Sequence, residues 1–225
     1  YAEYGRCKAS NAVITGYAKM DKLAEYMQNR RKKRRKTIMI APHHSVEGGT
    51  NDMLSLSNFV RYADLFLKLP EMYPNIDFIF RPHPVLFTVL SWGRHWGAER
   101  VEQYIAAMKA HKNVVYSTEG DYLEQFAQSD GIIQDCGSYL VEYLYTQKPG
   151  CYMLKSPADI DAKFAELGKQ CLEQYYISYN EQDILDYIDN VIIKGEDPKK
   201  EQREKFAREV VMVNYPHASE KVVDE

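Results

Sequence analysis

Short apolar runs alternate with amphipathic stretches along most of the chain. The apolar runs lie at residues 12–15, 37–40, 76–80, 114–116, 131–134 and 150–154. The run at 131–134 is apolar at consecutive positions between polar residues, which is typical of a parallel strand buried on both faces. We therefore read the six runs as strands.

The stretches between these runs carry apolar residues at helical spacing. Helices are expected near 21–28, 59–69, 99–109, 121–128, 159–174, 183–193 and 199–211. This β-α alternation predicts an α/β fold, with one Rossmann-like, doubly wound parallel sheet of about six strands. We expect a single domain over residues 1–225. Its last helices, from about residue 181 on, are expected to pack across the sheet or to reach back to a domain outside this sequence.

Residues 129–149 form the most informative stretch of the sequence. The strand at 131–134 is followed by Asp135, Cys136 and Gly137, which break the apolar run. Ser138 is a favourable N-cap for the helical pattern that follows. In an open α/β sheet, such a junction lies at the carboxyl end of a strand, where backbone N–H groups and the helix dipole favour a phosphate. An ordinary strand-to-helix turn remains the alternative.

A second polar junction follows the strand at 76–80, where the sequence reads Arg81-Pro82-His83-Pro84. Each proline holds its predecessor in extended geometry, so Arg81 and His83 should project to the same side. This predicts a rigid cationic fork. A simpler interpretation is that the two prolines only end the strand.

A loop rich in Gly and His, residues 41–50, follows the strand at 37–40 and contains His43 and His44. These side chains could bind phosphate or an acceptor, or one of them could serve only to hold the loop. A metal site formed with His83, Asp135 and Cys136 is the alternative, but these residues come from three loops without the short spacing of a zinc site. We expect no metal and no cofactor. Ser138 also lacks the G-x-S-x-G context of a hydrolase nucleophile.

Composition excludes several classes of protein. The 225 residues are 45% hydrophobic and carry 29 basic against 32 acidic side chains, a net charge of −3 that does not indicate a nucleic-acid partner. Four cysteines without paired spacing suit a reducing cytoplasm. No apolar run reaches the roughly 18 residues of a membrane span. The sequence begins at Tyr1 rather than Met, so we expect one domain of a longer protein.

One local charge run departs from this balance. It reads Arg30-Arg31-Lys32-Lys33-Arg34-Arg35-Lys36 and leads directly into the strand at 37–40. Such a run is usually a solvated connection, but it could also contact anionic lipid head groups or an anionic polymer. Nucleic acid is disfavoured because no aromatic residues are interleaved for stacking.

Four segments, in order, resemble the C-terminal half of the CDP-glycerol glycerophosphotransferases, the teichoic-acid and capsule polymerases with a GT-B fold. Residues 13–17 with Asp21 resemble the family's V-x-G-[YF]-P-R-x-D stretch, although Ala18 and Lys19 replace Pro and Arg. Residues 38–42 resemble the strand before its P-T-[WF] loop, where this chain has His43-His44 instead. Residues 80–84 are similar to its R-x-H segment, and residues 130–148 to its D-x-[LI]-I-T-D-Y-S-S-x-x-F-D stretch.

The resemblance implies a role for each matching residue. Arg81 and His83 would neutralise phosphate oxygens of a CDP-activated donor. Asp135 matches the Asp after the strand, and Gly137 and Ser138 match the Ser pair that would donate hydrogen bonds. Glu142, in place of the final Asp, could accept from ribose hydroxyls. The catalytic base is expected in an N-terminal half outside this sequence, so this half alone should be nearly inactive.

The function implied is transfer of a polyol phosphate, similar to glycerol phosphate, from the CDP donor to a cell-envelope polymer, capsule or lipid-linked acceptor. The location implied is the cytoplasm, peripheral to the membrane through residues 30–36. Two alternatives remain. One is a GT-B glycosyltransferase or sugar-nucleotide epimerase that uses a nucleoside-diphosphate sugar, and the other is a nucleotide-binding or membrane-docking module without chemistry of its own.

Overall fold

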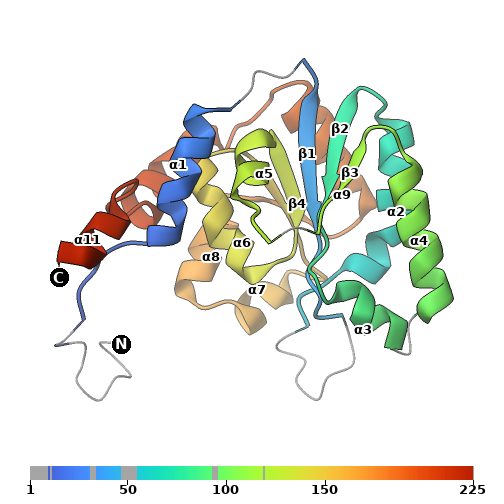
Figure 1. Ribbon diagram of the computed structural model, residues 1–225, viewed down its shortest axis with the longest axis horizontal. Helices are drawn as coiled ribbons and strands as arrows, with labels where there is room; N and C mark the ends of the chain where they lie inside the picture. The colour runs from blue at the N-terminus through green and yellow to red at the C-terminus, as the bar shows by residue number, and fades with distance from the viewer. Residues whose placement is uncertain are drawn as a thin grey trace.

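A six-stranded parallel sheet lies between two layers of helices (Figure 1). The computed structural model describes residues 10, 12–30, 34–46, 55–92, 96–118 and 120–224. The strands are β1 (Lys36–Ala41), β2 (Ile76–Phe80), β3 (Val114–Tyr116), β4 (Gly131–Gln134), β5 (Gly150–Met153) and β6 (Tyr176–Ser178). Their spatial order is β3-β2-β1-β4-β5-β6, and every pairing is parallel. The predicted Rossmann-like α/β class is confirmed.

Each face of the sheet packs on its own hydrophobic core. In β1, Ile38 and Ile40 point into one core, while Met39 and Ala41 point into the other. The first core includes α2 (Phe59–Met72), α3 (Leu86–Trp92), α4 (Ala98–Ala110), α9 (Glu181–Asp186) and the π-helical segment η4 (Tyr187–Ile193). The second includes η1 (Ala18–Met20), α1 (Asp21–Gln28), α5 (Leu123–Gln128), α6 (Gly137–Glu142), η3 (Tyr143–Thr146) and α8 (Glu166–Leu172). Burial on both faces explains why the strands read as continuous apolar runs.

One predicted strand is wrong and one strand was missed. Residues 12–15 form no strand, and the side chains of Val13 and Ile14 are 59% and 80% exposed. The sixth strand is instead β6, which pairs with β5 at the other side of the sheet. It was missed because Tyr176-Ile177-Ser178 contains a single aliphatic residue, whereas the equally short β3 reads Val-Val-Tyr. The expected helix at 159–174 is in fact two short helices, α7 (Ala158–Lys163) and α8.

The C-terminal helices pack on the same domain. These are α10 (Lys200–Phe206), the π-helical segment η5 (Ala207–Val211) and α11 (Ala218–Asp224). Both carboxylate oxygens of Asp21 accept from backbone amides at the start of α11, at 3.2 Å from Ala218 and 2.7 Å from Ser219. Figure 1 accordingly shows α11 beside α1. Contact of these helices with a further domain stays a prediction. Among the described helices, none is long and apolar enough to cross a membrane.

Candidate functional site

The loops after β1, β2 and β4 emerge at the same edge of the sheet and surround a pocket of about 230 Å³. We call it the carboxyl-edge pocket. Its lining residues are Ala41, Pro42, His43, Arg81, Pro82, His83, Pro84, Gly120, Tyr122, Cys136, Ser138 and Tyr139. Because β2 and β4 flank β1, Arg81, His83 and Ser138 meet here although they are far apart in the sequence.

Asp135 holds two segments beside this pocket in place by hydrogen bonds. Its carboxylate is fully buried and accepts from the backbone N–H of His43 at 2.7 Å and of Asn58 at 2.5 Å. It therefore ties the loop after β1 to the start of α2. Burial raises the pKa of Asp135 to about 7, although the two backbone hydrogen bonds act in the opposite direction. Asp135 is not among the pocket-lining residues, so the structure gives it a positioning role.

Three imidazoles, those of His43, His44 and His83, lie against one another. We call them the histidine cluster. Their ring centroids are 4.2 Å apart for His43 and His44, 4.0 Å for His44 and His83, and 5.3 Å for His43 and His83. Burial is the main cause that lowers the pKa of each ring, to about 4 for His43. The rings are therefore neutral at neutral pH.

Arg81 borders the pocket but is held from several sides. Its side chain donates to Ser117 Oγ at 2.8 Å and to the Gly120 carbonyl at 3.2 Å, with longer contacts of 3.4 Å to Gln125 and Tyr139. Arg81 is only 7% exposed. The prediction that Arg81 and His83 both carry a positive charge is thus wrong for His83. Arg81 supplies a fixed positive charge, whereas the lowered pKa of His83 leaves that side chain neutral.

Ser138 does not cap a helix as expected. Helix α6 begins one residue earlier, at Gly137, and Cys136 is its N-cap residue. The Ser138 hydroxyl lies 3.3 Å from Cys136 Sγ and lines the pocket. Burial raises the pKa of Cys136, so its side chain is an unreactive thiol.

Glu142 is committed to tyrosines rather than open to a ligand. Its carboxylate accepts from Tyr17 Oη at 2.7 Å and from Tyr122 Oη, and Lys19 Nζ lies 3.7 Å away. The residue is 3% exposed and does not line the pocket. Glu142 instead orients Tyr122, which does line it. This arrangement gives no support to the expectation that Glu142 accepts hydrogen bonds from ribose hydroxyls.

The sequence argument missed three pocket residues, Gly120, Tyr122 and Tyr139. The loop after β3 opens at the same edge as the other loops, so the topology rule applied to the first three loops would have brought residues 117–122 there as well. Tyr139 is the neighbour of Ser138 and was treated only as part of a helix. Two aromatic walls therefore accompany the polar groups.

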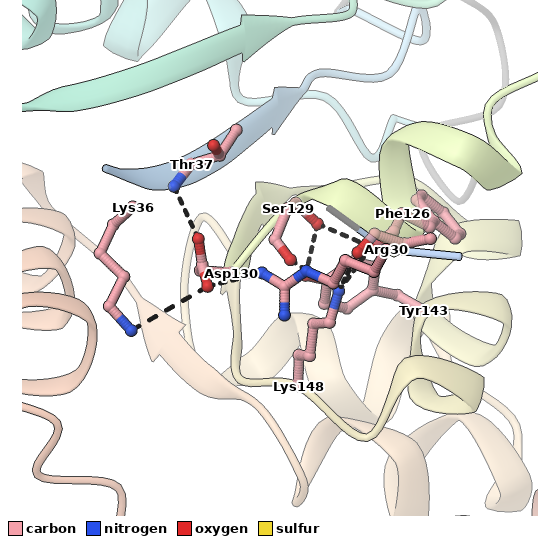
Figure 2. A network of polar contacts seen from close by, with 9 residues as sticks. Arg30, Lys36, Thr37, Phe126, Ser129, Asp130, Tyr143 and Lys148 are labelled. Atoms are coloured by element: carbon pink, nitrogen blue, oxygen red, sulfur yellow. Dashed lines mark hydrogen bonds and ion pairs between the residues drawn. The ribbon is translucent and has the colours of Figure 1, made fainter. Parts of the chain in front are cut away.

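The opposite edge of the sheet holds a separate polar network (Figure 2). Asp130, which precedes β4, accepts from the Thr37 amide at 2.8 Å and from Arg30 at 2.7 Å, and Lys36 Nζ lies 4.0 Å away. Lys148 Nζ donates to three carbonyls at the end of α5, those of Phe126, Ala127 and Ser129, at 2.6–3.0 Å. The ends of the basic run are thus tied to the fold. Its middle, residues 31–33, lies outside the described residues.

The architecture and the pocket together define the class of fold, one Rossmann-like half of a GT-B protein. No family model matches the chain, and no curated protein matches it. A variant of the wall teichoic acid polymerase TagF superposes with a TM-score of 0.62 at 18% identity, over 94% of this chain and 50% of that one. The Neisseria meningitidis UDP-GlcNAc 2-epimerase bound to UDP-GlcNAc gives 0.56 at 16% identity, over 94% and 53%.

A third similar structure, the S. aureus MnaA complex with UDP, gives a TM-score of 0.56 at 16% identity, over 96% of this chain and 54% of that one. The chain thus spans about half the length of these relatives. Identities this low show the fold that the proteins share.

Proposed function

We propose that the carboxyl-edge pocket binds the phosphates of a nucleoside-diphosphate donor, and that the chain is the donor-binding half of a transferase that moves a polyol phosphate from a CDP-activated donor. The observation that carries this proposal is the meeting of His43, His83 and Ser138 beside the Arg81 charge in one pocket. The donor half of a GT-B enzyme would present such a pocket at this edge of its sheet.

The pocket chemistry suits phosphate oxygens. A neutral imidazole donates through one ring N–H, a serine hydroxyl donates one hydrogen bond, and a nearby guanidinium compensates negative charge. Arg81 is positioned by Ser117 and Gly120, so it needs no rearrangement to contribute its field. Phosphoryl transfer depends mainly on such positioning and charge stabilisation.

The pocket size limits what it can enclose. At about 230 Å³ it is smaller than the roughly 300–1,000 Å³ of pockets that enclose a whole drug-sized ligand. It would therefore hold the diphosphate and the start of the transferred group. The base and ribose would lie against the rim, where Tyr122 and Tyr139 offer aromatic surface.

The remaining parts of the reaction lie beyond this chain. The chain covers about half of the similar polymerase, so a second domain would supply the catalytic base and the acceptor site. The acceptor is proposed to be a cell-envelope polymer or capsule chain at the cytoplasmic face of a membrane. We expect donor binding, but little turnover, from these residues alone.

A nucleoside-diphosphate sugar is the second candidate donor, because the epimerase structures with UDP-GlcNAc and UDP superpose nearly as well as the polymerase. Thermal unfolding with CDP, CMP, UDP and GDP distinguishes the two. A bound nucleotide at 100 times its dissociation constant stabilises the fold by about 2.7 kcal/mol. We expect CDP to exceed CMP and UDP. A larger shift with UDP would favour the sugar donor, and no shift with any diphosphate would contradict the proposed site.

A further inference from the structure

The histidine cluster has a property that donor binding does not require. Two adjacent residues after β1 and one residue after β2 place three imidazoles in mutual contact. At least one ring nitrogen from each residue lies within 4.8 Å of a nitrogen from each of the other two. The sequence argument against a metal depended on the separation of these residues along the chain, and the fold removes that separation.

The spacing of the rings is close to that of a metal centre. Three imidazoles around a tetrahedral cation, with metal–nitrogen bonds of about 2.1 Å, have ring centroids about 5 Å apart. His43 and His83 are at 5.3 Å, while His44 lies between them at 4.2 and 4.0 Å. The three spacings become nearly equal when the His44 ring centroid moves away from both neighbours by roughly 1 Å.

His44 would lose no hydrogen bond at its Nδ1 in this movement. Its Nδ1 is buried and has no hydrogen-bond partner among the described residues. An unsatisfied buried nitrogen destabilises the fold, so a ligand that occupies its lone pair would relieve that cost. No such argument applies to the exposed His217, whose Nδ1 lies 3.0 Å from Glu220.

The other two rings are oriented by neighbours, as metal-binding imidazoles usually are. His43 Nδ1 lies 2.8 Å from Ser45 Oγ and faces the Ser45 amide at 3.3 Å. The tautomer in which Nδ1–H donates to Ser45 Oγ gives up the longer contact and leaves the Nε2 lone pair free. His83 Nδ1 faces the Val85 amide at 3.3 Å, so binding through either nitrogen gives up at most one long hydrogen bond. The loop that carries His43 is fixed as well, because the His43 backbone N–H donates to the Asp135 carboxylate.

We propose that His43, His44 and His83 bind one divalent transition-metal cation of the Zn²⁺ class, with its fourth coordination position open to the carboxyl-edge pocket. Imidazole nitrogens select zinc and its neighbours in the first transition row rather than Mg²⁺ or Ca²⁺, which prefer oxygen. His43 and His83 both line the pocket, so a water molecule or an anion in the pocket could complete the coordination.

The test uses Co²⁺ as a spectroscopic probe in a phosphate-free buffer, after chelator treatment of the whole chain. Tetrahedral Co²⁺ bound to imidazoles absorbs visible light, and Zn²⁺ should displace it. We expect one equivalent of Co²⁺ bound per chain, and at least about tenfold weaker binding in His44→Ala and in His83→Ala, since even changes to residues that only orient metal ligands cost about 10–100-fold. The matched control, His217→Ala, should bind as the parent does.

Absence of a stoichiometric Co²⁺ signal in the parent would overturn the proposal, and so would unchanged affinity in both cluster variants. If a variant fails to fold, X-ray absorption of the Zn²⁺-loaded parent decides the question. Scattering from three imidazoles around the ion supports the site, and scattering from fewer than three contradicts it. No nucleotide is present in these experiments, so their outcome is independent of the proposed donor.

Discussion

Replacing Arg81 by Met should reveal that this residue supports the fold as well as the pocket. Methionine keeps much of the aliphatic volume and removes the guanidinium. The hydrogen bonds lost include those to Ser117 Oγ at 2.8 Å and to the Gly120 carbonyl at 3.2 Å. Ser117 Oγ keeps a partner, because Gln125 Nε2 donates to it at 2.6 Å. Hydrogen bonds to a charged group contribute about 1.5–3 kcal/mol each, so losing these two should cost about 3–6 kcal/mol.

The assay is urea unfolding, with thermal unfolding as a second probe. For a chain of this size each kcal/mol corresponds to about 2–4 °C in Tm, so Arg81→Met should unfold on the order of 10 °C earlier. Arg61→Met is the matched control. Arg61 is an exposed arginine whose guanidinium lies 5.5 Å from the Tyr62 ring, and its replacement should change stability by no more than about 0.5 kcal/mol.

The reasoning about Arg81 would be refuted if Arg81→Met unfolded with the same midpoint as the parent while nucleotide binding was lost. That result would mean that the guanidinium serves the ligand alone, as the sequence had indicated. His83→Ala offers the contrast. Its ring makes one long backbone contact, at 3.3 Å, so its loss should weaken diphosphate binding with little effect on stability.

Three further predictions concern other parts of the molecule. Lys148→Met should cost about 4 kcal/mol or more in urea unfolding, because three carbonyls lose a charged donor and each such hydrogen bond contributes about 1.5–3 kcal/mol. The surface control Lys194→Met should be nearly neutral, and equal losses in both variants would contradict this. Changing residues 31–34 to Gln should abolish sedimentation with anionic vesicles at low salt and leave Tm unchanged; binding that survives the change would exclude the membrane role. Burial raises the pKa of Asp135 from 3.8 to about 7. Between these two values the folded protein keeps a proton that the unfolded chain has already released, so the stability of the parent should fall as the pH rises through this window. Asp135→Asn does not titrate, and the fall is measured relative to this variant. The measurement is urea unfolding of the parent and of Asp135→Asn at about pH 5 and about pH 8. If the difference in unfolding free energy between the two proteins is the same at both pH values, the prediction is wrong.

The pattern of the sequence was sufficient for the centre of the sheet. The runs that form β1, β2 and β4 are buried on both faces, so burial alone makes them readable, and the topology of a parallel sheet then brings their loops to one edge. The sheet margin was less readable. Strand β6 carries one aliphatic residue, Ile177, in contrast to the two valines of the equally short β3. The apolar Val13 and Ile14 are exposed instead of pairing with a strand.

The sequence predicted which residues line the pocket better than it predicted what each of them contacts. Arg81, His83 and Ser138 could be assigned to one edge from chain order, but their hydrogen-bond partners come from segments whose approach no local pattern encodes. Arg81 is held by Gly120 and Ser117 after β3, and Glu142 is held by Tyr17 from the N-terminal segment. The neutral state of the histidine cluster likewise arises from tertiary burial, which sequence spacing does not report.

The most direct test of the central claim, that the carboxyl-edge pocket binds a nucleoside diphosphate, is an NMR titration of the histidine imidazoles with CDP in the presence of a metal chelator. The account predicts that the ring signals of His43, His44 and His83 shift in a saturable way. Those of His111, which precedes β3 at the opposite edge of the sheet, and of His217, which precedes α11, should stay in place. Saturable shifts confined to His111 or His217, or no shift in the histidine cluster at saturating CDP, would contradict it.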